Sequence, residues 1–102
     1  MEKTKQLSKF SFLGRPGFQM TFENGMTISV VWHKSAYCDR RSFDVDAYND
    51  TAPADCINAE VGAWDENGDW YRLGENDDVI GYQTPDQVAD LITKIKNLKT
   101  TV

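Results

Sequence analysis

Two runs of alternating apolar and polar residues constrain the fold of this chain most strongly. Apolar side chains occupy every second position from Phe18 to Phe22 and again from Met26 to Trp32. Asn24-Gly25 separates the runs, and an Asn-Gly pair between alternating segments is the strongest short-range signal of a β-hairpin. Asn and Gly both accept positive φ at low cost, so we expect a type I′ turn. One face of this hairpin is apolar and should meet the core.

A second Asn-Gly pair predicts another hairpin later in the chain. Asn67-Gly68 lies between two strand-like runs, 59–64 and 70–73. Shorter runs at 9–13 and 77–82 are also typical of strands. Together these segments predict a small antiparallel β-sheet built of hairpins.

A helix with a clear start signal follows the last strand. Thr84 can cap the helix, Pro85 suits its first position, and Gln87 completes a capping box. Apolar side chains then recur with helical spacing, at Val88, Leu91, Ile92, Ile95 and Leu98. We therefore predict one amphipathic C-terminal helix over residues 84–99, packed on one face of the sheet. The fold class is α+β in a single domain, 1–102, with a flexible lead-in at residues 1–8.

The net charge of −5 is concentrated in the middle of the chain. Residues 38–78 hold twelve acidic residues and three arginines, whereas residues 1–37 are net basic. A phosphate backbone needs clustered Lys and Arg, so direct nucleic-acid binding is excluded. The acidic band is compatible with a basic protein partner, a bound cation or solubility alone.

The beginning of the chain and its apolar runs favour a cytoplasmic protein. Residues 1–6 are charged and polar, and no apolar segment typical of a secretory signal follows them. No apolar run approaches the length of about 18 residues that crosses a membrane. In a cytoplasm, Cys38 and Cys56 are expected to be free thiols.

Residues 34–58 form the least regular stretch, and we predict that the binding surface lies there together with the turn at 74–78. Long segments without periodicity in a compact domain are often functional. Aromatic, Arg and polar side chains gather in and beside this stretch, as they do in binding surfaces. The candidate ligand- or partner-binding residues are Trp32, His33, Tyr37, Cys38, Arg40, Arg41 and Tyr48.

The sequence holds few residue arrangements that are typical of catalytic or metal-binding sites. His33, Cys38 and Cys56 match no spacing typical of structural zinc sites. A Cys38 nucleophile with His33 as base would lack any local sign of an oxyanion hole. The acidic run at 65–69 has its Gly at the fourth place, not the sixth as in a calcium loop, so a hairpin turn explains it better. We therefore predict no enzyme activity, no cofactor and no metal.

Several motifs resemble those of small uncharacterised accessory proteins encoded by tailed bacteriophages. The resemblance covers residues 18–95 and rests on F-x-N-G-M-T-I-S-V-x-W, A-Y-C-D at 36–39, A-E-V-G-A-W-D-E-N-G-D-W-Y at 59–71 and Q-T-P-D-Q-V-A at 83–89. It implies an accessory product acting in the host cytoplasm. Such small products commonly bind and inhibit a host protein or sequester a defence signal. No activity is assigned by the resemblance.

Three functions follow from these observations as hypotheses. The first is a non-enzymatic protein that binds a host protein through residues 34–58, as an inhibitor. The second is a small-ligand binder, for a nucleotide-like signal, that uses Tyr37, Arg40 and Arg41. The third is a weak acidic DNA mimic that competes for basic proteins. The number of aromatic residues is also compatible with a homodimer.

Overall fold

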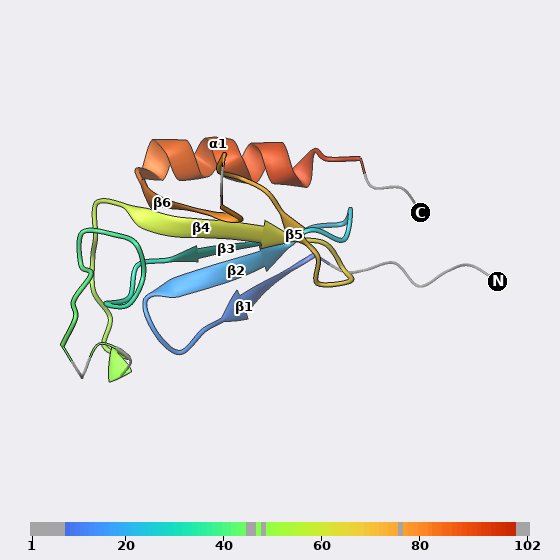
Figure 1. The fold of residues 1–102 in the computed structure, drawn as a ribbon. Helices are drawn as coiled ribbons and strands as arrows, with labels where there is room; N and C mark the ends of the chain where they lie inside the picture. Colours follow the sequence, from blue (N-terminus) through green and yellow to red (C-terminus); the bar gives the residue numbers. More distant parts are fainter. Residues whose placement is uncertain (1–7, 45–46, 48, 76, 100–102) are drawn as a thin grey trace.

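The computed structural model describes residues 8–44, 47, 49–75 and 77–99 and confirms the α+β fold class. Six antiparallel strands form one sheet, and one C-terminal helix packs on it (Figure 1). The strands are β1 Lys9–Phe12, β2 Gly17–Thr21, β3 Thr27–Val31, β4 Ala59–Trp64, β5 Trp70–Tyr71 and β6 Val79–Gln83; the helix is α1 Pro85–Lys96. The predicted flexible lead-in, residues 1–8, lies outside the described residues except for Ser8.

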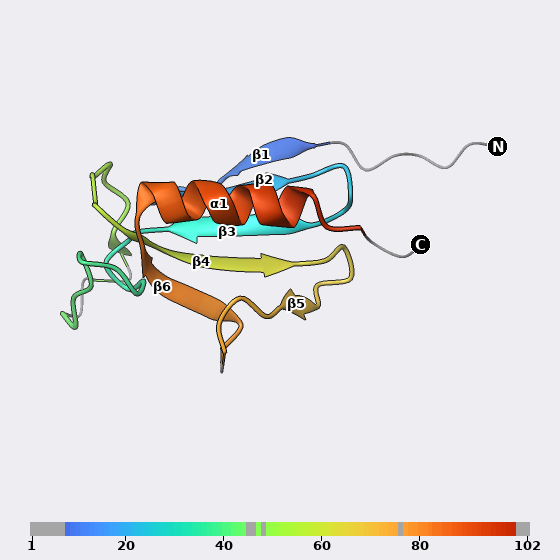
Figure 2. The same cartoon turned by 90° about the horizontal axis from the view of Figure 1, so that it is seen from above.

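The sheet runs β1-β2-β3-β4, and β5 and β6 both pair with β4. The β5 strand pairs with the end of β4 at Ala63 and Trp64, whereas β6 pairs with the part from Ala59 to Gly62. The two strands therefore share one edge of β4, end to end (Figure 2). The strand β1 forms the opposite edge of the sheet.

Both predicted hairpins are present, but the predicted type I′ turn at Asn24-Gly25 is wrong. The loop holds three residues, because the Phe22 N–H donates to the Met26 carbonyl and the Gly25 N–H to the Phe22 carbonyl. Gly25 alone takes the positive φ, 89°. Such a loop is a type I turn that ends in a left-handed glycine.

In this turn the Asn24 side chain bonds to two separate parts of the chain. Its Oδ1 accepts the N–H of Met26 at 2.9 Å, and its Nδ2 donates to three carbonyls at the C-terminal end of α1. The shortest of these bonds, 2.9 Å each, reach the carbonyls of Ile95 and Leu98. The last carbonyls of a helix have no partner within the helix, so Asn24 supplies one from the first hairpin.

The start of α1 agrees with its prediction in detail. The Thr84 hydroxyl accepts the Gln87 N–H at 3.2 Å, and the Gln87 side chain accepts the Thr84 N–H at 2.9 Å. Val88 and Ile95 are buried against the sheet, where Ile28, Val61 and other residues of β3 and β4 complete the core. No described helix has the length and apolarity needed to cross a membrane.

Candidate functional site

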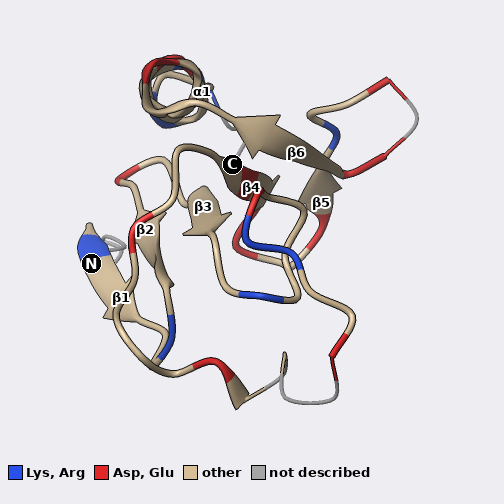
Figure 3. Cartoon of the chain, turned by 90° about the vertical axis from the view of Figure 1, so that its left-hand side faces the viewer, with Lys and Arg blue, Asp and Glu red and all other residues tan. Residues whose placement is uncertain are grey.

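The predicted binding segment, 34–58, connects β3 to β4 at one end of the sheet. Figure 3 looks onto this end of the molecule and shows both basic and acidic positions along its loops. Hydrogen bonds attach the segment to the sheet rather than leaving it as an open loop. The Tyr37 N–H donates to Glu60 Oε1 of β4, and the Tyr37 carbonyl accepts the Tyr82 N–H of β6. The Asp39 N–H donates to Asn58 Oδ1 at 2.8 Å.

A buried ion pair closes the segment on itself. Asp50 is buried, and its Oδ2 accepts from Arg40 Nη1 at 2.9 Å and from the Lys34 N–H at 2.9 Å. Arg40 Nη1 also donates to the Trp32 carbonyl at 3.0 Å. Burial raises the pKa of Asp50, but the Arg40 guanidinium and the Lys34 N–H outweigh it and hold the pKa below its ordinary value. We call these contacts the Arg40–Asp50 clasp; they direct Arg40 inward.

His33 and Cys38 are also turned into the protein, and they do not meet as a base and a nucleophile. His33 Nδ1 bonds to the N–H and the hydroxyl of Ser35, at 3.2 and 3.0 Å. The Cys38 thiol donates to the backbone carbonyl of His33 at 3.6 Å, away from the imidazole nitrogens. Burial lowers the pKa of His33, with a smaller effect from Arg15, and burial raises the pKa of the Cys38 thiol. These shifts favour the neutral form of both groups.

Among the described residues, no three His, Cys, Asp or Glu side chains come together where they could hold a metal ion. Cys38 and Cys56 are free thiols. At 65–69, Asp65 Oδ1 accepts the N–H groups of Asn67 and Asp69, so this carboxylate closes a turn.

Tyr37, Arg41 and Phe43 lie together at this end of the molecule, and both aromatic rings are exposed. The Arg41 guanidinium carbon lies 4.4 Å from the centre of the Tyr37 ring and 5.1 Å from the centre of the Phe43 ring. Arg41 Nη1 donates to the Ser35 carbonyl at 2.8 Å, which fixes the guanidinium between the rings. Tyr37 is 48% exposed and Phe43 is 88% exposed. We call Tyr37, Arg41 and Phe43 the aromatic stack.

The structure separates the predicted residues into inward and outward groups. Tyr37 and Arg41 belong to the aromatic stack, whereas Arg40, His33 and Cys38 point inward, and Tyr48 lies outside the described residues. Phe43 is not among the predicted binding residues. Its sequence context could have indicated it, because it is a large aromatic residue in an acidic run that has no strand or helix periodicity.

Trp32 lies beside a separate apolar groove. Its Nε1 donates to the Ala54 carbonyl at 2.8 Å, and its ring meets the Phe18 ring edge-on at 6.3 Å. The groove has a volume of about 400 Å³ and runs between α1, β2 and the segment before β4. We call it the helix groove; its lining includes Phe18, Trp32, Cys56, Val88, Ala89 and Ile92.

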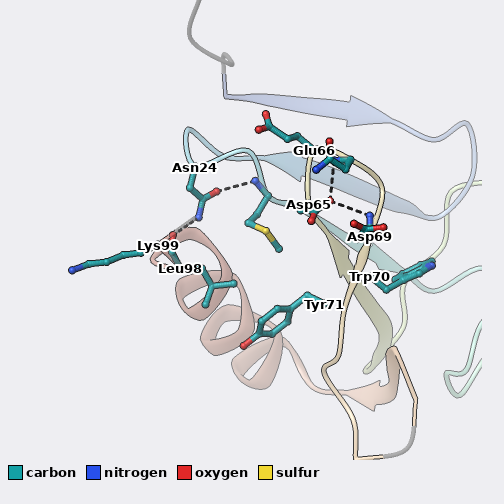
Figure 4. Close-up of a pocket in the computed structure, with 10 residues that line it drawn as sticks. Asn24, Asp65, Glu66, Asp69, Trp70, Tyr71, Leu98 and Lys99 are labelled. Carbon is teal, nitrogen blue, oxygen red and sulfur yellow. Dashed lines mark hydrogen bonds between the residues drawn. The ribbon is translucent and has the colours of Figure 1, made fainter. Parts of the chain in front are cut away.

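A second hollow lies at the opposite end of the sheet (Figure 4). It has a volume of about 310 Å³ and lies between the two Asn-Gly turns and the end of α1. Asn24 and Asp65, which line it, are both held by hydrogen bonds within turns or to the helix end. These polar groups therefore support the hairpins.

Comparison of the chain with known protein families, curated proteins and solved structures found no match. The resemblance to phage accessory proteins therefore depends on the sequence motifs alone. In the structure three of those motifs form the first hairpin, the second hairpin and the start of α1, and A-Y-C-D at 36–39 lies in the segment between β3 and β4.

Proposed function

We propose that this chain is a non-enzymatic protein-binding domain whose contact surface is the aromatic stack. One observation carries the proposal: Phe43 is 88% exposed, and the Arg41 guanidinium lies over both its ring and the Tyr37 ring, so aromatic and cationic groups gather at one exposed place. Exposing a large apolar ring to water is unfavourable, and a partner surface would remove that cost. Aromatic and Arg side chains are the commonest hot spots of protein interfaces.

The attachment of the segment to the sheet supports the same function. Tyr37 is hydrogen-bonded to both β4 and β6, and the Arg40–Asp50 clasp joins two parts of the same segment. At Gly81 an added Cβ would lie only 2.7 Å from the Cβ of Tyr37, so glycine permits the close approach of β6. Contact residues held in place before binding lose little conformational entropy when a partner docks.

The partner that we propose is a protein of a bacterial host, bound so that its own function is inhibited. The phage-type motifs of the sequence support this choice of partner. The acidic band from 38 to 78 supports a partner whose contact region is basic, because opposite charges speed association.

A small-ligand binder remains the second candidate, and the helix groove favours it. Its volume of about 400 Å³ falls in the range of small-molecule sites, and Trp32 offers an aromatic wall. The nucleotide site expected at Tyr37, Arg40 and Arg41 has less support. Arg41 itself fills the space between the two rings, and Arg40 is bonded to Asp50. The acidic DNA mimic is the third candidate, and its modest charge gives it the weakest support.

Two exposed phenylalanines allow a matched test of the first candidate. Phe43→Ala removes the outer ring of the stack, whereas Phe12→Ala removes an equally exposed ring on β1. Both substitutions should change the free energy of unfolding by less than about 0.5 kcal/mol, because the rings make few internal contacts. A partner captured from bacterial lysate and then purified should bind the Phe43→Ala variant about 30-fold more weakly, the effect of a hot spot of about 2 kcal/mol.

Titration calorimetry with the purified partner decides the result. Equal affinities of the parent and the Phe43→Ala variant would reject the aromatic stack as the contact surface. A thermal shift of the parent with nucleotides, in the absence of a protein partner, would favour the small-ligand function instead.

A further inference from the structure

The strand β1 leaves one edge of the sheet open. It pairs with β2 in the register Lys9–Thr21 to Phe12–Phe18, and no other described strand pairs with it. Its outer backbone N–H and C=O groups are therefore available to another strand. The four residues carry no Pro, no acidic residue and no bulge that would block such pairing.

The side chains of β1 make this edge apolar on one face. Residues directly opposite each other in an antiparallel pair share a face of the sheet. Phe10 lies opposite Met20, and Met20 lies opposite Ile28 of the core. Phe12 lies opposite Phe18 in the same way. Both phenylalanines therefore lie on the face that carries α1.

The helix α1 does not reach this part of the sheet. It packs on β3, β4 and β6, and β1 lies to one side of it in the view from above (Figure 2). As a result Phe10 is 77% exposed and Phe12 is 93% exposed. The apolar face of the sheet is thus wider than the helix that covers it.

We propose that a second copy of this chain pairs with β1, so that the two sheets become one. A two-fold axis perpendicular to the sheet keeps both helices on the same face and makes the two β1 strands antiparallel. Of the registers that keep Phe10 and Phe12 on one face, the register centred on Ser11 pairs both of them with phenylalanines of the second copy. Ser11 lies opposite Ser11 of the second copy, and Phe10 lies opposite Phe12 of the second copy.

In this register the aromatic rings of the two strands pair, and their charged side chains stay apart. Two Phe10–Phe12 pairs form across the interface, and aromatic pairs stabilise neighbouring strands. The two Lys9 side chains lie at opposite ends of the paired strands, so they do not repel each other. The acidic band begins at residue 38 and does not include β1.

The exposed area fits a weak dimer. Buried aromatic side chains remove about 150–250 Å² each from water, so Phe10 and Phe12 offer on the order of 300 Å² per copy. A standard interface needs roughly 800 Å² per partner. The strand backbone adds to the aromatic area without reaching an obligate interface. We expect a dimer that forms at micromolar concentration and dissociates on dilution.

Sedimentation velocity over a dilution series tests the association. The parent should shift from dimer to monomer on dilution, and Phe12→Lys should be monomeric at every concentration, because it would place a charge against the apolar strand of the second copy. Phe43→Lys, at a similarly exposed ring outside β1, should dimerise like the parent. Circular dichroism should show that both variants fold.

Disulfide trapping tests the register. Ser11→Cys should form a disulfide-linked dimer under mild oxidation, whereas Lys9→Cys should form much less, because only residue 11 meets its own copy. Peptide mass spectrometry should place the link at position 11. A parent that is monomeric at millimolar concentration would overturn the proposal. A dimer unaffected by Phe12→Lys, or one linked more readily through Lys9→Cys, would overturn it equally.

Discussion

Replacing Arg40 by Met should destabilise the protein through the carboxylate that it leaves behind. The Asp50 side chain is only 4% exposed and bonds to the Arg40 guanidinium and the Lys34 N–H. Met fills a similar volume without charge or hydrogen-bond donors. After the change the buried carboxylate keeps one backbone donor and loses its ion-pair partner.

The structure sets the order of magnitude of this effect. Removing one partner of a buried ion pair costs about 3–5 kcal/mol, because the remaining charge stays buried. Asp50→Asn should cost less, on the order of 1.5–3 kcal/mol, since the amide oxygen can still accept the Lys34 N–H. Arg40, at 18% exposure, can also turn toward water in that variant. The double variant Arg40→Met with Asp50→Leu should be more stable than Arg40→Met alone.

Urea unfolding followed by tryptophan fluorescence measures these differences, because Trp32 lies next to the clasp. Hydrogen exchange at the Lys34 N–H gives a local measure of the same contact. If Arg40→Met stayed within about 0.5 kcal/mol of the parent, or were milder than Asp50→Asn, the cost would not lie in the buried carboxylate, and the reasoning would be refuted.

The clasp also predicts how stability depends on pH. The folded state holds the pKa of Asp50 below its ordinary value of 3.8, so the unfolded state binds the proton more tightly. The stabilisation from Asp50 is complete at pH values above its ordinary pKa. It is lost as the pH falls from that value toward the lower pKa that Asp50 has in the folded state. Unfolding free energy measured from neutral to acidic pH should therefore fall less steeply in the Asp50→Asn variant than in the parent.

Three further predictions concern the helix and the thiols. Asn24→Ala should cost on the order of 1–2 kcal/mol in urea unfolding, because the carbonyls at the end of α1 lose their side-chain donor; a change near zero would show that water replaces it. Ile95→Ala should cost about 2–5 kcal/mol, since Ile95 is fully buried, while the exposed control Asp90→Ala should stay within about 0.5 kcal/mol. In native protein Cys56 should react with a thiol reagent much faster than Cys38, which is buried and has a raised pKa; equal rates would contradict this placement.

Much of the fold could be predicted because its signals are local. Alternation with period two identified the main strands, and the run T-P-D-Q at 84–87 identified the start of α1. The candidate site was predicted less well. The sequence pointed to residues 34–58, but composition does not distinguish an inward arginine from an outward one. Arg40 and Arg41 are neighbours with opposite roles, because only Arg40 reaches the carboxylate of Asp50.

The hairpins, the helix and its apolar stripe follow from the order of the residues alone, since each depends on residues a few positions apart. The tertiary structure decided the contacts between distant segments. Asn24 finds the end of a helix 71 residues further along the chain, and that contact accompanies a turn different from the expected one. The width of the sheet relative to a single helix likewise decided that Phe10 and Phe12 are exposed. Local patterns carry no information about such contacts, because they depend on which surfaces meet when the whole chain packs.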